Sequence, residues 1–405
     1  MKTNACLLAL ITPPYGRCCY AFLRSSSSYF GHRALAALCA STARRNAAAA
    51  FSPSWTALTS TRSGETDQES WCGHELRNTV TTEWVQDHLG DPEVALVDIR
   101  GRVLKHRVEG SDFFITSYEG MRSDYLDAHI PGAVFVDWTT DIAGTDDAGV
   151  PAQLADREKF VTAMEERGIG GAKRVVVYDN GDMLFATRFW WAMRRFGHDR
   201  VSVMDGGWAK WQAERRAITP DCPCPFKIYT DWDIPPERER PGLVACAADV
   251  RAALDATGTP VQLLDARAAA QYTGEVRRAR RGGHIPGAVN TPYRAFLAEG
   301  GSGSDGGTFK VFKDLEGIKE VFESAKVDTS PSAAAVIAYC NGGVASTVAL
   351  FLLFQLRPLG GPSGQTGGSV GGGGGGDALG DGSWANYDGS WNEWGNDDSA
   401  PVETL

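Results

Sequence analysis

The stretch AVIAYCNGGVAS, residues 335–346, sets an apolar run directly before a cysteine and two glycines. A second apolar segment, TVALFLLF, follows at 347–354. Short apolar runs bounded by glycine are typical of buried strands in parallel sheets, and the longer segment is typical of a packed helix. The stretch therefore predicts a strand, a tight turn and a helix, with the thiol of Cys340 at the carboxyl end of the strand.

An earlier copy of this stretch lacks the cysteine. RVVVYDNG at 174–181 aligns with AVIAYCNG at 335–342, an offset of 161 (335 − 174), so Asp179 stands where Cys340 stands. HIPGAV at 129 returns at 284, and DGGWAKW at 205 returns as DGSWNEW at 388. Two copies of one pattern predict two domains of the same fold.

Each copy alternates short apolar segments with helical patterns. The expected strands are 95–100, 134–138, 175–179 and 201–205 in the first copy, and 261–267, 288–293, 335–340 and 384–388 in the second. Helical patterns cover 157–169, 186–197 and 312–327. Such alternation predicts an α/β fold, with two domains that each contain a mostly parallel sheet flanked by helices.

The repeat also sets the domain boundaries. We expect a first domain at 81–220, a Pro-rich linker at 221–244 and a second domain at 245–405, with a flexible Gly-rich insertion at about 358–383 that loops out. Residues 1–64 contain seven Lys or Arg and no Asp or Glu, which is typical of an organellar transit peptide. Its Arg content favours the mitochondrion, with plastid or cytoplasm as alternatives.

Composition excludes several classes of protein. The chain has 405 residues and a formal net charge of −10, which argues against broad nucleic-acid binding. No uninterrupted apolar run reaches the roughly 20 residues that a membrane-spanning helix needs. Of the nine cysteines, four precede residue 65 and only Cys340 has surroundings that point to chemistry.

Five motifs resemble the tandem rhodanese family, the thiosulfate and 3-mercaptopyruvate sulfurtransferases: GHIPGAVN, LLDAR, CNGGVAS, YDGSWNEWG and a terminal PVE segment. The resemblance covers nearly everything from residue 81 onward. It implies that the second domain carries the active cysteine and that the first domain, with Asp179, is inactive. It also implies a small anionic sulfur donor and a thiol or cyanide acceptor, such as thioredoxin or glutathione for the thiol. We expect no cofactor, no metal, no nucleic acid and no membrane as partners.

The loop after Cys340 is suited to sulfur chemistry. Gly342 and Gly343 allow a tight turn, so that backbone N–H groups and the start of the helix from Val344 point at the sulfur and stabilise negative charge on it. A thiolate held there can attack the outer sulfur of a donor and carry it as a persulfide. The predicted site therefore consists of the catalytic Cys340 and a substrate-binding loop made of Asn341, Gly342, Gly343, Val344, Ala345 and Ser346.

The chain departs from the family at the expected anion site. Where the family has a substrate-binding Arg, this chain has Gln271 in QYTG. The family's second Arg aligns with Arg277 across a short deletion, and Arg278, Arg280 and Arg281 are candidate substitutes. Because Asn341, Gly342 and Gly343 are uncharged, we expect 3-mercaptopyruvate to be a better donor than the dianion thiosulfate, unless the Arg run compensates the second charge.

Other interpretations are weaker but stay open. His129 and His284 begin the same HIPGA motif in the two copies, and Asp265 has a counterpart in Asp98 of the first copy. These residues are therefore expected to be structural. A regulatory or sulfur-carrier module without efficient turnover is one alternative, because of Gln271. A phosphatase is another, but its cysteine loop needs Arg six residues after the cysteine, where this chain has Ser346.

Overall fold

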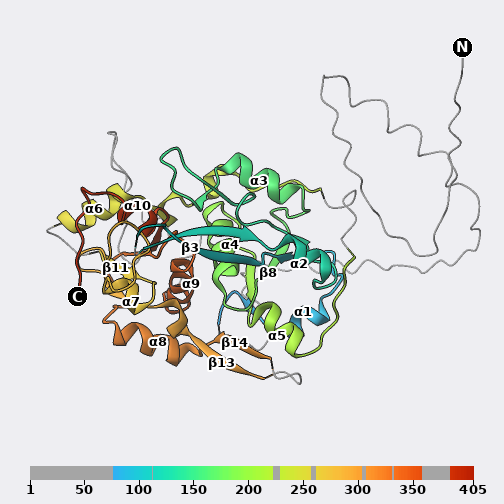
Figure 1. Ribbon diagram of the computed structural model, residues 1–405. Helices are drawn as coiled ribbons and strands as arrows, with labels where there is room; N and C mark the ends of the chain where they lie inside the picture. Colours follow the sequence, from blue (N-terminus) through green and yellow to red (C-terminus); the bar gives the residue numbers. More distant parts are fainter. Residues whose placement is uncertain are drawn as a thin grey trace, which may run out of the picture. The chain divides into compact units, whose positions relative to one another are not determined.

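A computed structural model of the chain describes residues 76–111, 113–221, 229–256, 261–302, 307–330, 333–357 and 384–405 (Figure 1). The predicted transit peptide, the DCPCP segment of the linker from residue 222 and the Gly-rich insertion lie outside the described residues. Among the helices that are described, none has the length and apolar character needed to cross a membrane.

The first domain contains a five-stranded parallel sheet with the order β1-β9-β8-β2-β5. Its strands are β1 (Thr79–Val80), β2 (Val94–Asp98), β5 (Val134–Phe135), β8 (Arg174–Tyr178) and β9 (Val201–Met204). Its helices are α1 (Thr82–Asp87), α2 (Arg122–Asp127), α3 (Arg157–Glu165), α4 (Leu184–Arg195) and α5 (Gly207–Ala213). Side chains of α1 and α5 pack on one face of the sheet, and those of α3 and α4 pack on the other.

The second domain repeats this sheet with the order β10-β16-β15-β11-β12, again all parallel. Its strands are β10 (Val244–Ala245), β11 (Gln262–Asp265), β12 (Val289–Asn290), β15 (Val336–Tyr339) and β16 (Trp384–Tyr387). Its helices are α6 (Ala247–Asp255), α7 (Ala269–Tyr272), α8 (Leu315–Ser324), α9 (Ser346–Leu356) and α10 (Ser390–Trp394). The predicted α/β fold with two parallel-sheet domains is confirmed.

Helices α4 and α9 hold the two domains together. They occupy corresponding positions in the two copies and pack against each other, as Figure 1 shows near its centre. The Trp190 ring meets that of Phe351 edge-on at 4.9 Å, and the hydroxyls of Thr187 and Thr347 lie 2.9 Å apart. One hydrophobic core therefore runs through both domains.

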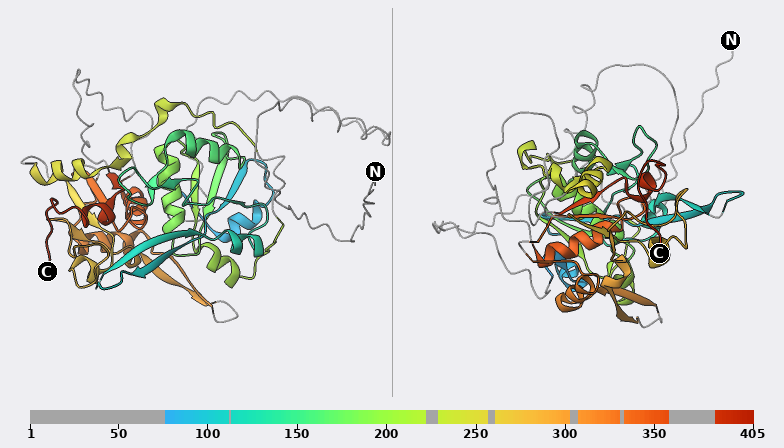
Figure 2. Two further views of the ribbon diagram at one scale, coloured as in Figure 1. Left: turned by 45° about the horizontal axis from the view of Figure 1, so that its top comes forward. Right: turned by 90° about the vertical axis from the view of Figure 1, so that its left-hand side faces the viewer.

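The structure adds antiparallel hairpins that the apolar pattern did not predict. β3 (Gly101–Arg107) pairs with β4 (Phe114–Gly120), and β13 (Leu297–Ser302) pairs with β14 (Thr308–Phe312). A short pair, β6 (Ala143–Gly144) and β7 (Gln153–Leu154), is the third. The β3–β4 hairpin crosses from the first domain to the second, where the N–H of Phe114 donates to the carbonyl of Arg277 at 3.1 Å (Figure 2). This crossing makes the hairpin part of the site described next.

Candidate active site

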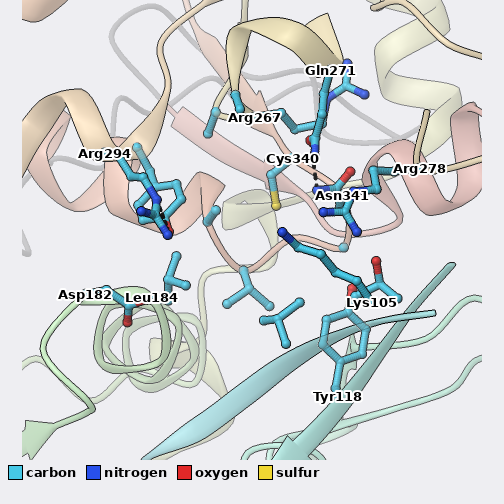
Figure 3. A pocket seen from close by; sticks show the side chains of 18 of the residues that line it. Lys105, Tyr118, Asp182, Leu184, Arg267, Gln271, Arg278, Arg294, Cys340 and Asn341 are labelled. Atoms are coloured by element: carbon cyan, nitrogen blue, oxygen red, sulfur yellow. Dashed lines mark hydrogen bonds between the residues drawn. The ribbon is translucent and has the colours of Figure 1, made fainter. Parts of the chain in front are cut away.

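Cys340 lies directly after β15, at the carboxyl edge of the second sheet. Its residue surface is 3% exposed, and its side chain lines a cavity of about 350 Å³ (Figure 3). The carboxyl ends of parallel strands are where open α/β sheets bind ligands. Both domains contribute to the cavity wall, so the thiol faces a space that the second domain does not enclose by itself.

The first domain shows what kind of group the corresponding loop holds. The carboxylate of Asp179 accepts hydrogen bonds from the backbone N–H groups of Gly181 (2.8 Å), Met183 (3.3 Å), Phe185 (3.0 Å) and Ala186 (3.3 Å). Burial raises the pKa of this carboxyl, while the four N–H groups oppose that shift. The loop is thus an anion cradle, and in the first domain its own side chain fills it.

In the second domain three of the four corresponding N–H groups can serve a ligand on the sulfur, whereas the fourth, that of Thr347, donates to the Val344 carbonyl at 3.2 Å. Gly342, Val344 and Ser346 stand at the positions of Gly181, Met183 and Phe185, and no acceptor within the described residues takes their N–H groups. A persulfide on Cys340 would extend into this cradle and receive those hydrogen bonds.

The structure corrects part of the expected loop geometry. Helix α9 begins at Ser346, not Val344. The N–H of Gly343 does not point to the sulfur, because it donates to Ser390 Oγ at 3.0 Å, as the N–H of Cys340 does at 3.1 Å. Gly343 has φ of 70°, a left-handed conformation that favours glycine.

Gly342 is required for a different reason. Tyr118 of β4 and Asn392 of α10 lie directly over it, and a Cβ at this position would collide with the Tyr118 hydroxyl and the Asn392 amide. The Asn392 amide donates to Tyr118 Oη at 3.1 Å, which leaves the hydroxyl proton available to the cavity. Burial and the charge of the nearby Cys340 sulfur raise the pKa of Tyr118, so the hydroxyl stays a donor.

Ser346 contacts the sulfur from behind the loop. Its hydroxyl lies 3.7 Å from Cys340 Sγ and donates to Asn386 Oδ1 at 2.6 Å. The Asn386 amide donates to the Gly343 carbonyl at 2.9 Å and to Asp388 at 3.1 Å, which fixes Oδ1 as the acceptor. Ser346 therefore orients the sulfur but does not line the cavity.

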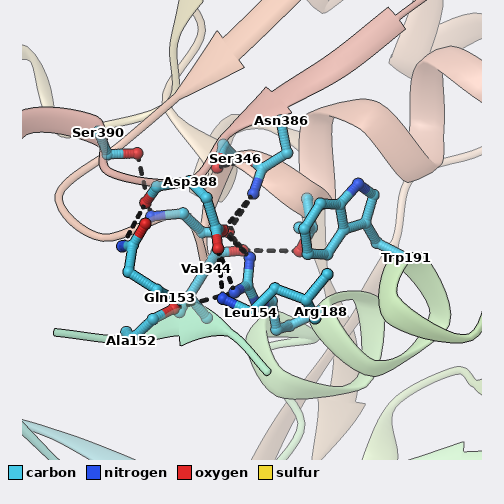
Figure 4. A network of polar contacts seen from close by, with 12 residues as sticks. Ala152, Gln153, Leu154, Arg188, Trp191, Val344, Ser346, Asn386, Asp388 and Ser390 are labelled. Carbon is cyan, nitrogen blue, oxygen red and sulfur yellow. Dashed lines mark hydrogen bonds and ion pairs between the residues drawn. The ribbon is translucent and has the colours of Figure 1, made fainter. Parts of the chain in front are cut away.

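A buried ion pair ties this network to the first domain (Figure 4). Arg188 of α4 forms a two-pronged pair with Asp388, and the two side chains are 0% and 6% exposed. The same guanidinium donates to the Gly343 carbonyl at 3.1 Å and to the Ala152 carbonyl at 2.9 Å. The position of the cysteine loop thus depends on a side chain of the other domain.

Three cationic side chains without a carboxylate partner among the described residues line the cavity that contains Cys340. Lys105 comes from β3, Arg278 from the segment after α7 and Arg294 from the 3₁₀ turn Tyr293–Phe296. The positive charge of Arg278 lowers the pKa of Lys105, with smaller contributions from burial and from Arg294. Like charges this close favour an anionic ligand between them.

One carboxyl faces the same space. Asp182 lines the cavity near Arg294, and its buried Oδ1 has no hydrogen-bond partner within the described residues. Burial, followed by repulsion from Asp179, raises the pKa of Asp182 to about 7, although the positive charge of Arg294 opposes the shift. This carboxyl therefore changes charge near neutral pH.

The structure brings together most of the predicted site. Cys340, Asn341, Gly342, Val344 and Ala345 line the cavity, whereas Gly343 and Ser346 lie behind the wall. Gln271 also lines it and accepts a hydrogen bond from the Asn341 amide at 3.2 Å.

The arginines between residues 277 and 281 do not lie where the prediction placed them. Arg278 lines the cavity, but Arg277 does not, and its guanidinium lies 5.8 Å from the centre of the Phe113 ring. Arg280 and Arg281 donate to the C-terminal segment, to the carbonyls of residues such as Asn396 and Ala400. Sequence alignment across the deletion could not separate neighbours that point in different directions.

The residues expected to be structural lie outside the cavity wall. The imidazoles of His129 and His284 are hydrogen-bonded to the carbonyls of Tyr125 and Tyr272, at 2.7 and 2.8 Å. Asp265 forms a buried ion pair with Arg267 at 2.5 Å, so this cavity-lining Arg already has a carboxylate partner.

Sequence reasoning missed Lys105, Tyr118, Asp182 and Arg294. For the first two, the Gly-containing segment VEGS at 108–111 is a turn signal that could have suggested a hairpin, but the flanking residues do not show the apolar alternation that identifies its strands. Within the described residues, no cluster of three His, Cys, Asp or Glu side chains could hold a metal ion.

Comparison with known proteins agrees with this geometry. The model of the rhodanese-like domain matches residues 81–214 and again 247–397. The chain therefore belongs to the rhodanese-like domain family and carries two copies of the domain in tandem.

Its relatives include 3-mercaptopyruvate sulfurtransferases and putative thiosulfate sulfurtransferases. The 3-mercaptopyruvate sulfurtransferase of Escherichia coli is 29% identical over 334 residues, which is 80% of this chain and 98% of that protein. A putative thiosulfate sulfurtransferase of Mycobacterium bovis is 30% identical over 331 residues, 80% of this chain and 89% of that protein. The crystal structure of the Escherichia coli enzyme matches with a TM-score of 0.57 at 28% identity and covers 78% of this chain and 98% of that one.

Proposed function

We propose that the protein is a sulfurtransferase that moves a sulfane sulfur from a small anionic donor, 3-mercaptopyruvate or thiosulfate, to a thiol or cyanide acceptor through a persulfide on Cys340. The observation that carries this proposal is the anion cradle beside the thiol: the N–H groups of Gly342, Val344 and Ser346 have no acceptor within the described residues, and their counterparts in the first domain donate to the Asp179 carboxylate. A cavity of about 350 Å³ suits a small donor.

The reaction follows from the groups around the sulfur. The Cys340 thiolate attacks the outer sulfur of the donor, the bond from that sulfur to the rest of the donor breaks, and its electron pair leaves with the product. That product is sulfite from thiosulfate, or the enolate of pyruvate from 3-mercaptopyruvate, which takes a proton from solvent. An acceptor thiolate then attacks the outer sulfur of the persulfide, or cyanide attacks it to give thiocyanate, and the Cys340 thiolate is restored.

We propose 3-mercaptopyruvate as the preferred donor. It carries one negative charge, and the loop residues Asn341, Gly342 and Gly343 add no positive charge. The ionised Asp182 carboxylate would oppose the second charge of thiosulfate. The three cations that line the cavity favour binding of both donors. The preference is therefore measured as the ratio of kcat/KM for 3-mercaptopyruvate to kcat/KM for thiosulfate.

The test uses Cys340→Ser and the wild-type protein without residues 1–64. Ser is nearly isosteric with Cys, so the variant should keep its melting temperature and lose both persulfide formation, measured by mass spectrometry, and turnover with either donor. A second persulfide site, or turnover by the variant, would contradict the proposal. A persulfide that forms but is not released to thiols or cyanide would instead support the alternative, a sulfur-carrier module that lacks the family's Arg at Gln271.

We also propose that residues 1–64 direct the protein to the mitochondrion. Their seven cationic and no acidic side chains support this proposal. Fusing these residues to a fluorescent protein tests it, and location in the plastid or the cytoplasm would overturn it.

A further inference from the structure

One face of the β3–β4 hairpin forms a wall of the cavity that contains Cys340. Val103 pairs with Tyr118, and Lys105 pairs with Thr116, in the antiparallel register. Side chains two residues apart on a strand share a face. These four side chains line the cavity, and Val103 among them is still 39% exposed, which places this part of the wall at the cavity's edge.

Lys105 is the charged member of this face. It extends from the hairpin toward Cys340 and Arg278 (Figure 3). In the part of the chain that the structure describes, no ion pair joins Lys105, Arg278 or Arg294 to a carboxylate. Three unpaired cations around one small cavity repel each other, and an anion between them relieves that repulsion.

The second domain does not supply all of the cations that line the cavity. Gln271, which lines the cavity beside Asn341, is uncharged and is engaged with the Asn341 amide. Arg267 is paired with Asp265. The second domain thus supplies two available cations, Arg278 and Arg294, and the third comes from the first domain.

We propose that Lys105 is a ligand of the donor's anionic group, so that the first domain, which lacks the cysteine, supplies part of the donor-binding site. The proposal deepens the proposed function and depends on it only for the identity of the anion. An ammonium on a flexible stem can follow either a carboxylate or a sulfonate group. Lys105→Gln removes the ammonium and its charge-assisted hydrogen bond to the donor. The variant should therefore raise KM for either donor about tenfold or more, with a larger effect for the dianion thiosulfate.

The matched control is Arg102→Gln, three positions earlier on β3 and on the opposite face of the hairpin. Arg102 is 47% exposed and pairs with Asp124, so this variant removes the same charge from the same hairpin outside the cavity. Its KM values should equal those of the wild type. Lys105→Arg, which keeps the charge, should retain most of the affinity. Both Lys105 variants should keep the wild-type melting temperature, because the side chain lies at the edge of a solvent-accessible cavity.

A second readout does not require turnover. Iodoacetate is an anion and iodoacetamide is neutral, and both alkylate the Cys340 thiolate. Their rate ratio, followed at Cys340 by peptide mass spectrometry, reports attraction of an anion to the cavity and is insensitive to changes in thiolate content. Lys105→Gln should lower this ratio severalfold, whereas Arg102→Gln should leave it unchanged.

The two readouts separate the two proposals. A Lys105-dependent ratio in a protein that turns over neither donor would keep Lys105 as an anion ligand and overturn the sulfurtransferase proposal. Normal turnover with an unchanged KM and ratio in Lys105→Gln would overturn the role of Lys105 and leave the proposed function intact.

Discussion

Replacing Arg188 by Met should destabilise the whole molecule. The guanidinium is fully buried between the domains and satisfies Asp388 and the carbonyls of Gly343 and Ala152. Met fills similar volume but donates no hydrogen bond. The substitution therefore leaves a buried carboxylate and two carbonyls without their cationic partner.

The expected loss of stability follows from the burial of the ion pair between Arg188 and Asp388. Removing one partner of a buried ion pair costs about 3–5 kcal/mol. With an unfolding entropy of about 2.1 cal/mol/K per residue over roughly 300 residues, each kcal/mol shifts the melting temperature by roughly 1.6 °C, so it should fall by about 5–8 °C. The exposed pair of Arg102 and Asp124 provides the control, since Arg102→Met should cost about 0–1 kcal/mol.

The assay is differential scanning calorimetry of both variants at neutral pH, together with persulfide formation measured well below the transition. Arg188→Met should also form persulfide more slowly, because the Gly343 carbonyl loses one of its two side-chain donors. Adding Asp388→Asn to this variant should restore part of the stability, because it removes the unpaired charge. Equal shifts in Arg188→Met and Arg102→Met would refute the reasoning.

Two further predictions concern the cavity. The Asp182 carboxyl, with its pKa raised to about 7 by burial, gains negative charge as the pH rises, so kcat/KM for an anionic donor should fall from about pH 6 to about pH 8. Asp182→Asn should flatten that decline, and an unchanged pH profile would count against Asp182. Gly342→Ala should cost about 1–3 kcal/mol and slow turnover, since the new methyl group meets Tyr118 and Asn392. Gly242→Ala, where a Cβ meets nothing, is its control, and equal effects would contradict the crowding argument.

The two sheets were predictable because their strands are buried on both faces. The observed β8 (Arg174–Tyr178) and β15 (Val336–Tyr339) coincide with unbroken apolar runs, and the repeat fixes their common order. The hairpins were not predictable in this way. The strand GRVLKHR of β3 is mostly exposed, and its inward face bears a lysine, so no apolar alternation marks it.

The site was predictable only as far as it is local in sequence. Cys340 and its loop form one continuous stretch, and their chemistry can be read from residue types. Lys105 and Asp182 reach the cavity from the other domain, and Arg188 of that domain reaches the cysteine loop, so the site depends on how the two domains pack through α4 and α9. A single sequence does not specify that packing.

The β3–β4 hairpin also bears on how the protein matures during synthesis. Its last residue leaves the ribosome 220 residues before Cys340 does (340 − 120), which at ordinary rates of translation is roughly 10–45 s. The hairpin is therefore synthesised before the thiol. Once the second domain folds, the hairpin can close one side of the cavity that contains Cys340; in a chain with the domains in reverse order, that side would stay open until the hairpin was synthesised.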